Sequence, residues 1–293
     1  MKRRRLEPVS RDTSRLSDPH PTIAQALAAV KLAAVDARVL MRLALGVDDT
    51  CLIAHADEAL SAEQNAAVAA LVARRAVGEP VAYIVGTREF FSLEFKVTPA
   101  VLIPRPETEL LVEFALECVS PAQACRVLDL GTGSGCIAIS IARHRPRSQV
   151  VAVDRSEDAL AVARENATWH ATRNLEFLRS DWFAALGNQR FDLIVANPPY
   201  VAAGDSHLKE GDLRFEPASA LVAGADGFAC IRAIVAAAPR YLQSGGWLAF
   251  EHGYDQAVRC RELLRETGFA AGFSRKDHAG IERLSGGRRD SMS

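Results

Sequence analysis

The tetrapeptide Asn197-Pro198-Pro199-Tyr200 combines an amide, two prolines and a phenol directly after an apolar, branched run at residues 191–196 that predicts a buried strand. Proline lacks an N–H donor, fixes its own φ and restricts the residue before it, so the strand must end here. The Asn197 side-chain oxygen and the Pro198 carbonyl are then held rigidly at a strand tip, where open α/β sheets bind ligands. Alone, the pattern also fits an ordinary strand-ending turn.

A second motif has the spacing Asp-x-Gly-x-Gly-x-Gly and joins a predicted strand at 126–130 to a predicted helix at 135–144. Glycines let the backbone turn sharply and approach a ligand closely, and the helix start offers free N–H groups. The spacing differs from the dinucleotide pattern G-x-G-x-x-G, and an Asp at this place disfavours a pyrophosphate and suits an ammonium group. A tight strand-to-helix connection is the alternative. The residues expected to bind a cofactor here are Asp129, Gly131, Thr132, Gly133, Ser134 and Gly135.

The next two predicted strands also end in polar residues. Asp154 follows an apolar strand 19 positions after Gly135, where an acidic side chain hydrogen-bonds ribose hydroxyls. Asp181 and Trp182 follow the third strand, and an acid beside an aromatic ring could hold an adenine. A helix cap at Asp154 and a small packing cluster at Asp181 and Trp182 are the structural alternatives.

These four strand tips occur in order along the chain, and together they describe a pocket for a nucleoside that carries an amino-acid tail. S-adenosylmethionine fits this description, and we expect Asn197 to border its site as well. The six cysteines include no C-x-x-C pair and the histidines show no ligand spacing, so no metal site is predicted.

Composition narrows the class of protein. The 293 residues suffice for two domains, and 49% hydrophobic with 24% charged residues is ordinary for a globular protein. A net charge of −1 does not suggest a stable nucleic-acid partner. No apolar run approaches the ~20 residues that a membrane helix needs. Scattered cysteines favour reduced thiols in the cytoplasm.

The predicted organisation has four parts. Residues 1–20 are basic and rich in Pro and Ser, and we expect a disordered tail; a transit peptide is the alternative. Residues 21–80 predict a small helical domain, with capping boxes at Thr22 and Ser61. After Thr22, helical spacing places Ile23, Leu27, Val30 and Ala34 near one face of a helix, and Gly46 is a plausible helix stop. A further helix is expected from 62 to about 76. Alternating residues at 81–106, Tyr83 to Val85 included, predict a β-hairpin linker.

Residues 107–293 then predict an α/β domain with a mostly parallel, doubly wound, Rossmann-like sheet. A helix is expected from Glu107 or Thr108 to about Val119. Further helices are expected at about 135–144, 157–171, 227–241 and 255–267. Strands are expected at about 126–130, 149–153, 175–179, 191–196, 246–251, 270–275 and 281–284.

On these motifs the sequence resembles the class I S-adenosylmethionine-dependent methyltransferases. More closely, it resembles the protein-(glutamine-N5) methyltransferases of peptide chain release factors, the PrmC/HemK family, over about residues 21–285. Besides the glycine loop and Asn197 to Tyr200, the stretches that carry this resemblance are Gly78 to Ile84, Arg88 to Phe90, Leu102 to Glu109, Glu216-Pro217, Leu221 to Gly227, Glu251 to Gly253 and Asp277 to Gly280. The resemblance implies that the helical domain helps to grip a class 1 release factor and that the target is the glutamine of the factor's Gly-Gly-Gln loop.

The residues themselves suggest how an amide could be methylated. Its nitrogen lone pair is delocalised into the carbonyl, so positioning is the main requirement. The Asn197 oxygen and the Pro198 carbonyl can each accept one N–H of the target amide and stabilise the positive charge that develops. Tyr200 is expected to pack on the target amide and exclude water, and Pro199 to border the same substrate site.

Two other functions remain open at this point. An N-methyltransferase that acts on an exocyclic amine of DNA or RNA would use the same Asn-Pro-Pro-Tyr chemistry. The near-neutral charge, the absence of a large recognition insert and the Pro-Arg-Pro-Glu-Thr-Glu stretch at 104–109 argue against it. A non-enzymatic binding module on the same fold is the second alternative, and the intact Asp129, glycine loop and Asn197 argue against that.

Overall fold

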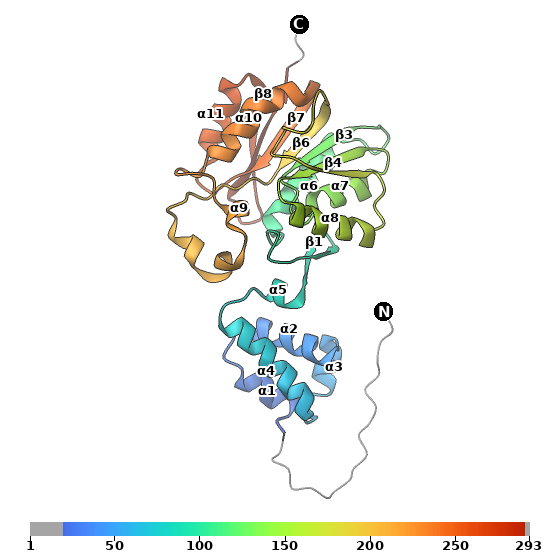
Figure 1. Ribbon diagram of the computed structural model, residues 1–293, viewed down its shortest axis with the longest axis vertical. Coiled ribbons are helices and arrows are strands. Elements are labelled where there is room, and N and C mark those ends of the chain that lie inside the picture. Colours follow the sequence, from blue (N-terminus) through green and yellow to red (C-terminus); the bar gives the residue numbers. More distant parts are fainter. Residues whose placement is uncertain (1–19, 291–293) are drawn as a thin grey trace, which may run out of the picture. The chain divides into compact units, whose positions relative to one another are not determined.

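The computed structural model describes residues 20–290, so all but the last residue of the predicted tail at 1–20 lies outside the described part of the chain. The chain divides between Val85 and Gly86 into two compact units (Figure 1). None of the helices between residues 20 and 290 has both the length and the apolar character that a bilayer crossing requires.

The N-terminal unit is helical, as predicted. The capping boxes at Thr22 and Ser61 are both formed, and Gly46 ends a helix in the left-handed conformation with φ of 67°. Leu40 and Met41 are fully buried, and Met41 belongs to the small apolar core of this unit. The helices are α1 (Ile23–Ala29), α2 (Ala34–Leu45), α3 (Asp49–Ala54), α4 (Ala62–Ala76) and α5 (Val81–Val85).

Two local predictions in this unit differ from the structure. The first helix ends at Ala29, Val30 is extended, and α2 begins separately at Ala34, although no Gly or Pro marks the break. Residues 81–85 form α5 rather than part of the hairpin. Pro80 cannot donate to a strand ladder, and its carbonyl accepts from the N–H groups of Tyr83 and Ile84 to start a helical turn instead.

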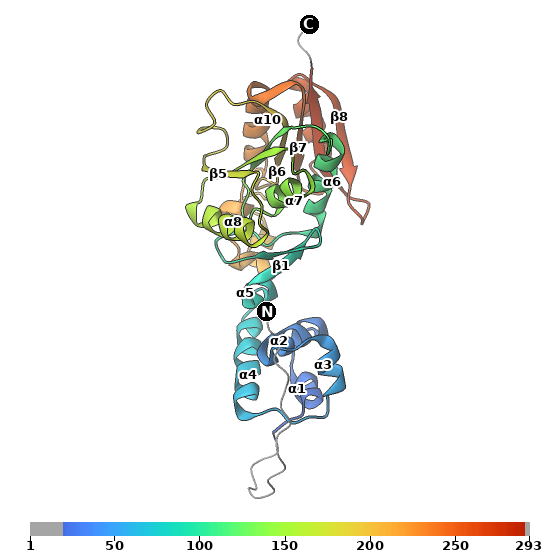
Figure 2. The same ribbon diagram turned by 90° about the vertical axis from the view of Figure 1, so that its right-hand side faces the viewer.

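The C-terminal unit is built on a seven-stranded sheet in the order β5-β4-β3-β6-β7-β9-β8. Figure 2 labels β5, β6, β7 and β8 of this sheet. The five strands from β5 to β7 are parallel, and β9 and β8 are antiparallel additions, so the sheet is mostly parallel as predicted. Chain order reverses between β3 and β6, which is where such sheets bind ligands. The strands are β3 (Arg126–Leu130), β4 (Gln149–Asp154), β5 (Leu175–Arg179), β6 (Phe191–Ala196), β7 (Leu242–Glu251), β8 (Phe269–Lys276) and β9 (Glu282–Arg289).

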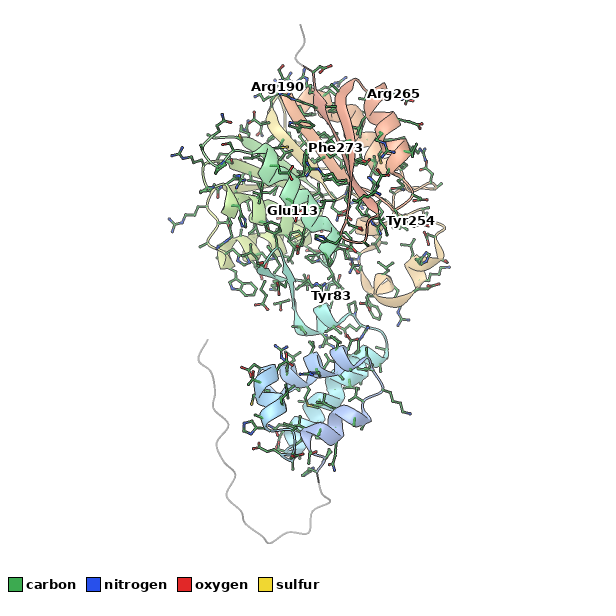
Figure 3. The ribbon with its side chains drawn as sticks, turned by 180° about the vertical axis from the view of Figure 1, so that it is seen from behind. Tyr83, Glu113, Arg190, Tyr254, Arg265 and Phe273 are labelled. Carbon is green, nitrogen blue, oxygen red and sulfur yellow. The ribbon has the colours of Figure 1, made fainter. Side chains whose placement is uncertain are left out.

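Helices cover both faces of this sheet. One apolar cluster joins α6 (Glu109–Cys118), α7 (Cys136–His144) and α8 (Glu157–Trp169) to one face, and Figure 3 shows Glu113 of α6 and Phe273 of β8 on that side. A second cluster joins α10 (Ala229–Tyr241) and α11 (Ala257–Glu266) to the other. Such double coverage explains why the central strands are apolar throughout rather than alternating. The short elements are η1 (Pro106–Thr108), η2 (Ser206–Lys209), η3 (Gly211–Phe215) and α9 (Ala218–Leu221).

A β-hairpin of β1 (Thr87–Phe90) and β2 (Leu93–Lys96) opens the C-terminal unit. Phe90 and Phe95 are fully buried in the same cluster as α6 and α7, so the hairpin is packed into this unit. The Asn166 amide joins it to the glycine loop, because its Nδ2 donates to the carbonyls of both Lys96 (3.0 Å) and Ser134 (2.8 Å).

Candidate active site

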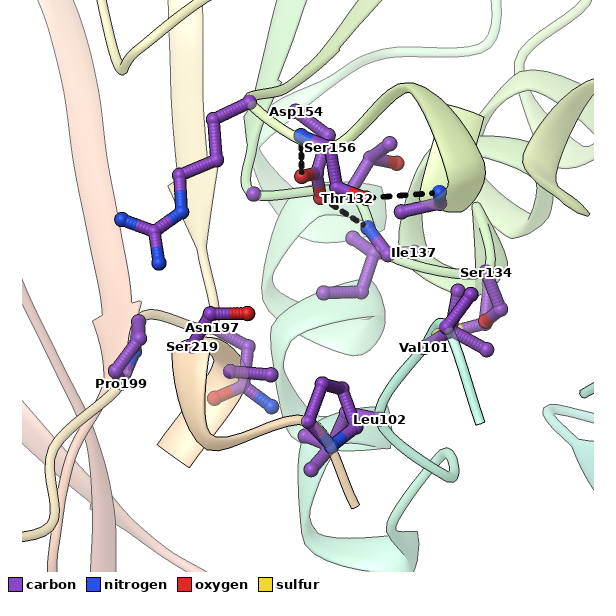
Figure 4. A pocket seen from close by; sticks show the side chains of 18 of the residues that line it. Val101, Leu102, Thr132, Ser134, Ile137, Asp154, Ser156, Asn197, Pro199 and Ser219 are labelled. Atoms are coloured by element: carbon purple, nitrogen blue, oxygen red, sulfur yellow. Dashed lines mark hydrogen bonds between the residues drawn. The ribbon is translucent and has the colours of Figure 1, made fainter. Parts of the chain in front are cut away.

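One cavity lies across the carboxyl ends of β5, β4, β3 and β6, the four neighbouring strands whose tips the sequence singled out (Figure 4). Most of the predicted residues line it. They are Gly131, Thr132, Gly133, Ser134, Asp154, Asp181, Trp182, Asn197 and Pro199. The other predicted residues lie close in the sequence to residues that line the cavity, but they are not part of the lining. They are Asp129, Gly135, Pro198 and Tyr200.

The glycine loop turns sharply between β3 and α7. The N–H groups of Gly131 and Thr132 both donate to the Val153 carbonyl of β4, and all three glycines have φ between 55° and 82°. A side chain on Gly135 would lie 3.0 Å from Ile139 Cδ1 and 3.2 Å from Ala163 Cβ. This glycine therefore serves the packing of the loop, whereas Gly133 has open space where a Cβ would be.

Asp154 is fixed by backbone donors at the tip of β4. Its Oδ2 accepts from the Gly133 N–H at 3.0 Å and its Oδ1 from the Ser156 N–H at 2.9 Å, as Figure 4 marks. The helix cap that the sequence offered as an alternative belongs to Ser156, whose hydroxyl accepts from Ala159 at the start of α8. Each carboxylate oxygen of Asp154 keeps a lone pair for a hydroxyl donor in the cavity.

Asp129 is completely buried below the loop. Its Oδ2 accepts from the Thr132 hydroxyl at 2.6 Å, and its Oδ1 has no hydrogen-bond partner. Burial raises the pKa of the Asp129 carboxyl to about 7, against the lowering effect of the Thr132 hydrogen bond. A buried carboxylate oxygen without a donor is costly, and a nearby cation would stabilise its ionised form.

Asp181 and Trp182 complete the far end of the cavity beyond β5. Trp182 has φ of 47°, which a bulky residue adopts only under strain. Its ring carbon Cζ3 lies 3.6 Å from where a Cβ on Gly131 would be, so the indole extends across the sheet edge to the glycine loop. The structure thus brings these two strand tips together.

Asn197 is held by two buried residues that are distant in sequence. Its Nδ2 donates to the Thr108 hydroxyl at 3.0 Å, and that hydroxyl donates to Glu251 Oε2 at 2.6 Å. The other oxygen of Glu251 accepts from the Tyr200 hydroxyl at 3.0 Å. Burial raises the pKa values of both Glu251 and Tyr200. The ring of Tyr200 packs on the apolar core that α10 and α11 cover.

Two family models match the chain. Residues 107–221 match the methyltransferase small domain, and residues 22–86 match the PrmC N-terminal domain. The release factor glutamine methyltransferase of Burkholderia pseudomallei is 55% identical over 277 residues, which is 92% of this chain and 97% of that protein. The enzyme of the same name from Pseudomonas aeruginosa is 49% identical, covering 87% and 92% of the two chains.

The chain belongs to the release factor glutamine methyltransferase family. Among solved structures, a Thermus thermophilus 16S rRNA N2 G1207 methyltransferase in complex with AdoMet and guanosine has a TM-score of 0.52 at 23% identity, covering 69% of this chain and 49% of that one. A Pyrococcus furiosus methyltransferase also has a TM-score of 0.52, at 18% identity and 75% and 98% coverage. At these identities the likeness establishes the fold alone, which is that of the class I methyltransferases.

This family member is an S-adenosylmethionine-dependent methyltransferase, and its cavity fits that cofactor. The carboxylate of Asp154 faces the cavity, as the hydroxyls of a ribose would require. The unpartnered oxygen of Asp129 suits a cationic ligand nearby, and open space above Gly133 allows a close approach to the loop. Among residues 20–290, no cluster of three or more His, Cys, Asp or Glu could hold a metal ion.

Sequence reasoning gave no role to several residues of the methyltransferase site. Residues from the loop at 100–105 and from the segment at 217–222 also line the cavity. Glu216 ties them together, because its buried carboxylate pairs with Arg105 and accepts from the Ile103 N–H at 3.1 Å. Arg105, Thr108, Glu216 and Glu251 all lie in stretches that carried the family resemblance, which was the available signal.

Proposed function

We propose that this protein transfers the methyl group of S-adenosylmethionine to the side-chain amide nitrogen of a glutamine, in the Gly-Gly-Gln loop of class 1 peptide chain release factors. The observation that carries the proposal is the position of Asn197. It lines the same cavity as Asp154 and the glycine loop, at the adjacent strand tip, with its Nδ2 bonded to Thr108. Its Oδ1 is then the atom that remains for a substrate N–H.

The cofactor half of the cavity holds the methyl donor. The Asp154 carboxylate accepts hydrogen bonds from the ribose hydroxyls. Asp181 and Trp182 border the adenine, and the loop from Gly131 to Gly135 borders the amino-acid tail. Asp129 provides negative charge below that loop. The donor supplies a methyl group on a sulfonium, which is already a strong electrophile, so the protein has no need to activate it further.

The target half positions the glutamine amide. The nitrogen lone pair is delocalised, and the amide must be aligned for that pair to reach the methyl carbon. Asn197 Oδ1 and the Pro198 carbonyl accept the two N–H groups, and the same oxygens stabilise the positive charge that develops on nitrogen. After transfer, loss of one N–H proton restores the neutral amide. Pro199 forms the wall of the cavity beside Asn197.

Recognition of a protein loop is assigned to the helical domain at 21–80, together with the hairpin region at 81–106. Remote contacts of this kind provide binding energy that holds a reacting group in place. The formal net charge of −1 supports a protein substrate rather than a stable nucleic-acid complex. Because release factors act on the ribosome, we place the reaction in the cytoplasm.

Mass spectrometry of a release factor before and after incubation with this protein and S-adenosylmethionine tests the proposal. We expect one added methyl group, located by fragmentation on the glutamine of the Gly-Gly-Gln loop. A factor with that glutamine replaced by alanine is the matched control and should stay unmodified. If radiolabelled donor instead marks total RNA or DNA and leaves the factor unlabelled, the nucleic-acid alternative is correct.

A further inference from the structure

The side chain of Asn197 is symmetric in shape but not in chemistry, since one end of its amide accepts hydrogen bonds and the other donates. The proposed reaction needs the accepting end to face the target. A rotation by 180° about the last side-chain bond would present an NH₂ group to the substrate N–H groups, and no hydrogen bond could form. Something in the protein must therefore select one orientation.

Thr108 and Glu251 provide this selection. Both are nearly inaccessible, with 2% and 3% of their surfaces exposed. A hydroxyl has one hydrogen, and that of Thr108 is directed to Glu251 Oε2 at 2.6 Å. Thr108 Oγ1 therefore presents only lone pairs to Asn197, and only the NH₂ end can bond to it, at 3.0 Å.

Glu251 sets the direction of the whole chain of hydrogen bonds. Its two oxygens are each within 3.0 Å of a hydroxyl, from Thr108 and from Tyr200. Both hydroxyls donate to it, so its two oxygens act as acceptors and the hydrogens of both hydroxyls point toward Glu251. The fold permits this meeting because β6 and β7 are parallel neighbours, with Ala196 opposite Phe250, so that Asn197 and Glu251 follow side by side.

We propose that Glu251 is a positioning residue that acts through Thr108 to hold the Asn197 amide with its oxygen toward the substrate. Tyr200 belongs to the same arrangement, because its bond to Glu251 anchors the segment that carries Asn197. The requirement that the Asn197 oxygen faces the substrate rests on the proposed function. The orientation of the Asn197 amide rests only on its buried contacts.

Thr108→Val tests the proposal with little change in shape, because valine replaces only the hydroxyl. We expect kcat for methylation of the release factor to fall by about tenfold or more, while KM for the factor changes less, as for an interaction needed mainly in the transition state. Affinity for S-adenosylmethionine should be unchanged. Thr108→Ser restores the hydroxyl and should recover most of the rate. Glu251→Gln should also be slow, because its NH₂ group can reverse the hydrogen-bond direction.

Ser285→Ala is the matched control for general damage to the fold. Its hydroxyl is also fully buried and bonds to His252 Nε2 at 2.8 Å, beside the same strand, but it has no link to Asn197. This variant should lose stability comparable to that lost by Thr108→Val and keep its kcat. A kcat for Thr108→Val within about threefold of the unaltered protein, or equal slowing in Thr108→Val and Thr108→Ser, would overturn the proposal.

A measurement without substrate separates this inference from the proposed function. The side-chain amide resonances of Asn197, identified by their loss in Asn197→Ala, should show slow hydrogen exchange that becomes fast in Thr108→Val and stays slow in Ser285→Ala. Unchanged exchange in Thr108→Val would overturn the positioning role. Failure of the unaltered protein to methylate any release factor would overturn the proposed function, and the amide exchange would still decide the inference.

Discussion

The two halves that we propose for the cavity, one for the cofactor and one for the target, are built in different ways. The cofactor half consists of loops that each follow one strand, and backbone N–H groups hold its main carboxylate, Asp154. The target half depends on side chains from distant parts of the chain. Thr108 and Asn197 are 89 positions apart, and Arg105 and Glu216 are 111 apart. The first half is therefore set by local sequence and the second by the packing of the whole unit.

The largest expected effect is in the target half. Asn197→Ala removes the acceptor at the rigid strand tip, and we expect the methylation rate to fall by about 10²–10³-fold, as for other single preorganised groups. Donor affinity should stay near normal, because Asp154 and the glycine loop are untouched. Single-turnover kinetics and calorimetry measure the two quantities, and circular dichroism verifies the fold. A large loss of donor affinity with normal turnover would instead assign Asn197 to the cofactor half.

A change in the substrate tests how strictly the target half fixes geometry. A release factor with Asn in place of the Gly-Gly-Gln glutamine has an amide one methylene shorter. We expect methylation slower by about 10²-fold, since a displacement of about 1 Å can cost that much. Rates for the two factors under the same conditions give the result. Comparable rates would mean that the cavity tolerates a mobile amide and that Asn197 does not define its position.

The cofactor half should respond to Asp154→Ala in the opposite way. Loss of two hydroxyl contacts should weaken donor binding by about tenfold or more, at roughly 1 kcal/mol for each hydrogen bond. The rate at saturating donor should change much less, because the carboxylate is proposed to bind the ribose, away from the methyl group. Isothermal calorimetry measures the affinity. An unchanged dissociation constant would remove Asp154 from the donor site.

The smallest expected effect is a pH dependence that arises from Asp129. Burial raises the pKa of this carboxyl to about 7 in the free protein, so the group is mostly protonated below that pH. A cationic donor favours the ionised form, and binding must then release a proton. Donor affinity should therefore fall as the pH decreases through 7, by up to about tenfold for each pH unit.

Calorimetry in buffers of different ionisation enthalpy would detect the released proton directly. Asp129→Asn, which cannot ionise, should abolish both the proton release and the slope of affinity against pH. Persistence of the slope in this variant would assign it to another group and would leave Asp129 with a structural role only.

The sequence predicted much of the fold because its signals are local. Capping boxes at Thr22 and Ser61, the left-handed stop at Gly46 and the apolar strands of a doubly covered sheet all follow from neighbouring residues. The break between Ala29 and Ala34 was missed because no breaker residue marks it. The helix at 81–85 was missed because Pro80 can precede a helical turn as readily as a strand.

For the site, the sequence by itself determined which residues follow the four strands. Parallel pairing of these strands then placed their carboxyl ends at one edge of the sheet. Tertiary structure alone decided what each side chain faces. The Tyr200 hydroxyl donates to Glu251, and Asp129 is buried beneath the glycine loop. Thr108, Asn197 and Glu251 meet only because three distant elements converge. Spacing along the chain indicates where a strand ends. It does not indicate which buried polar groups from distant elements become hydrogen-bond partners.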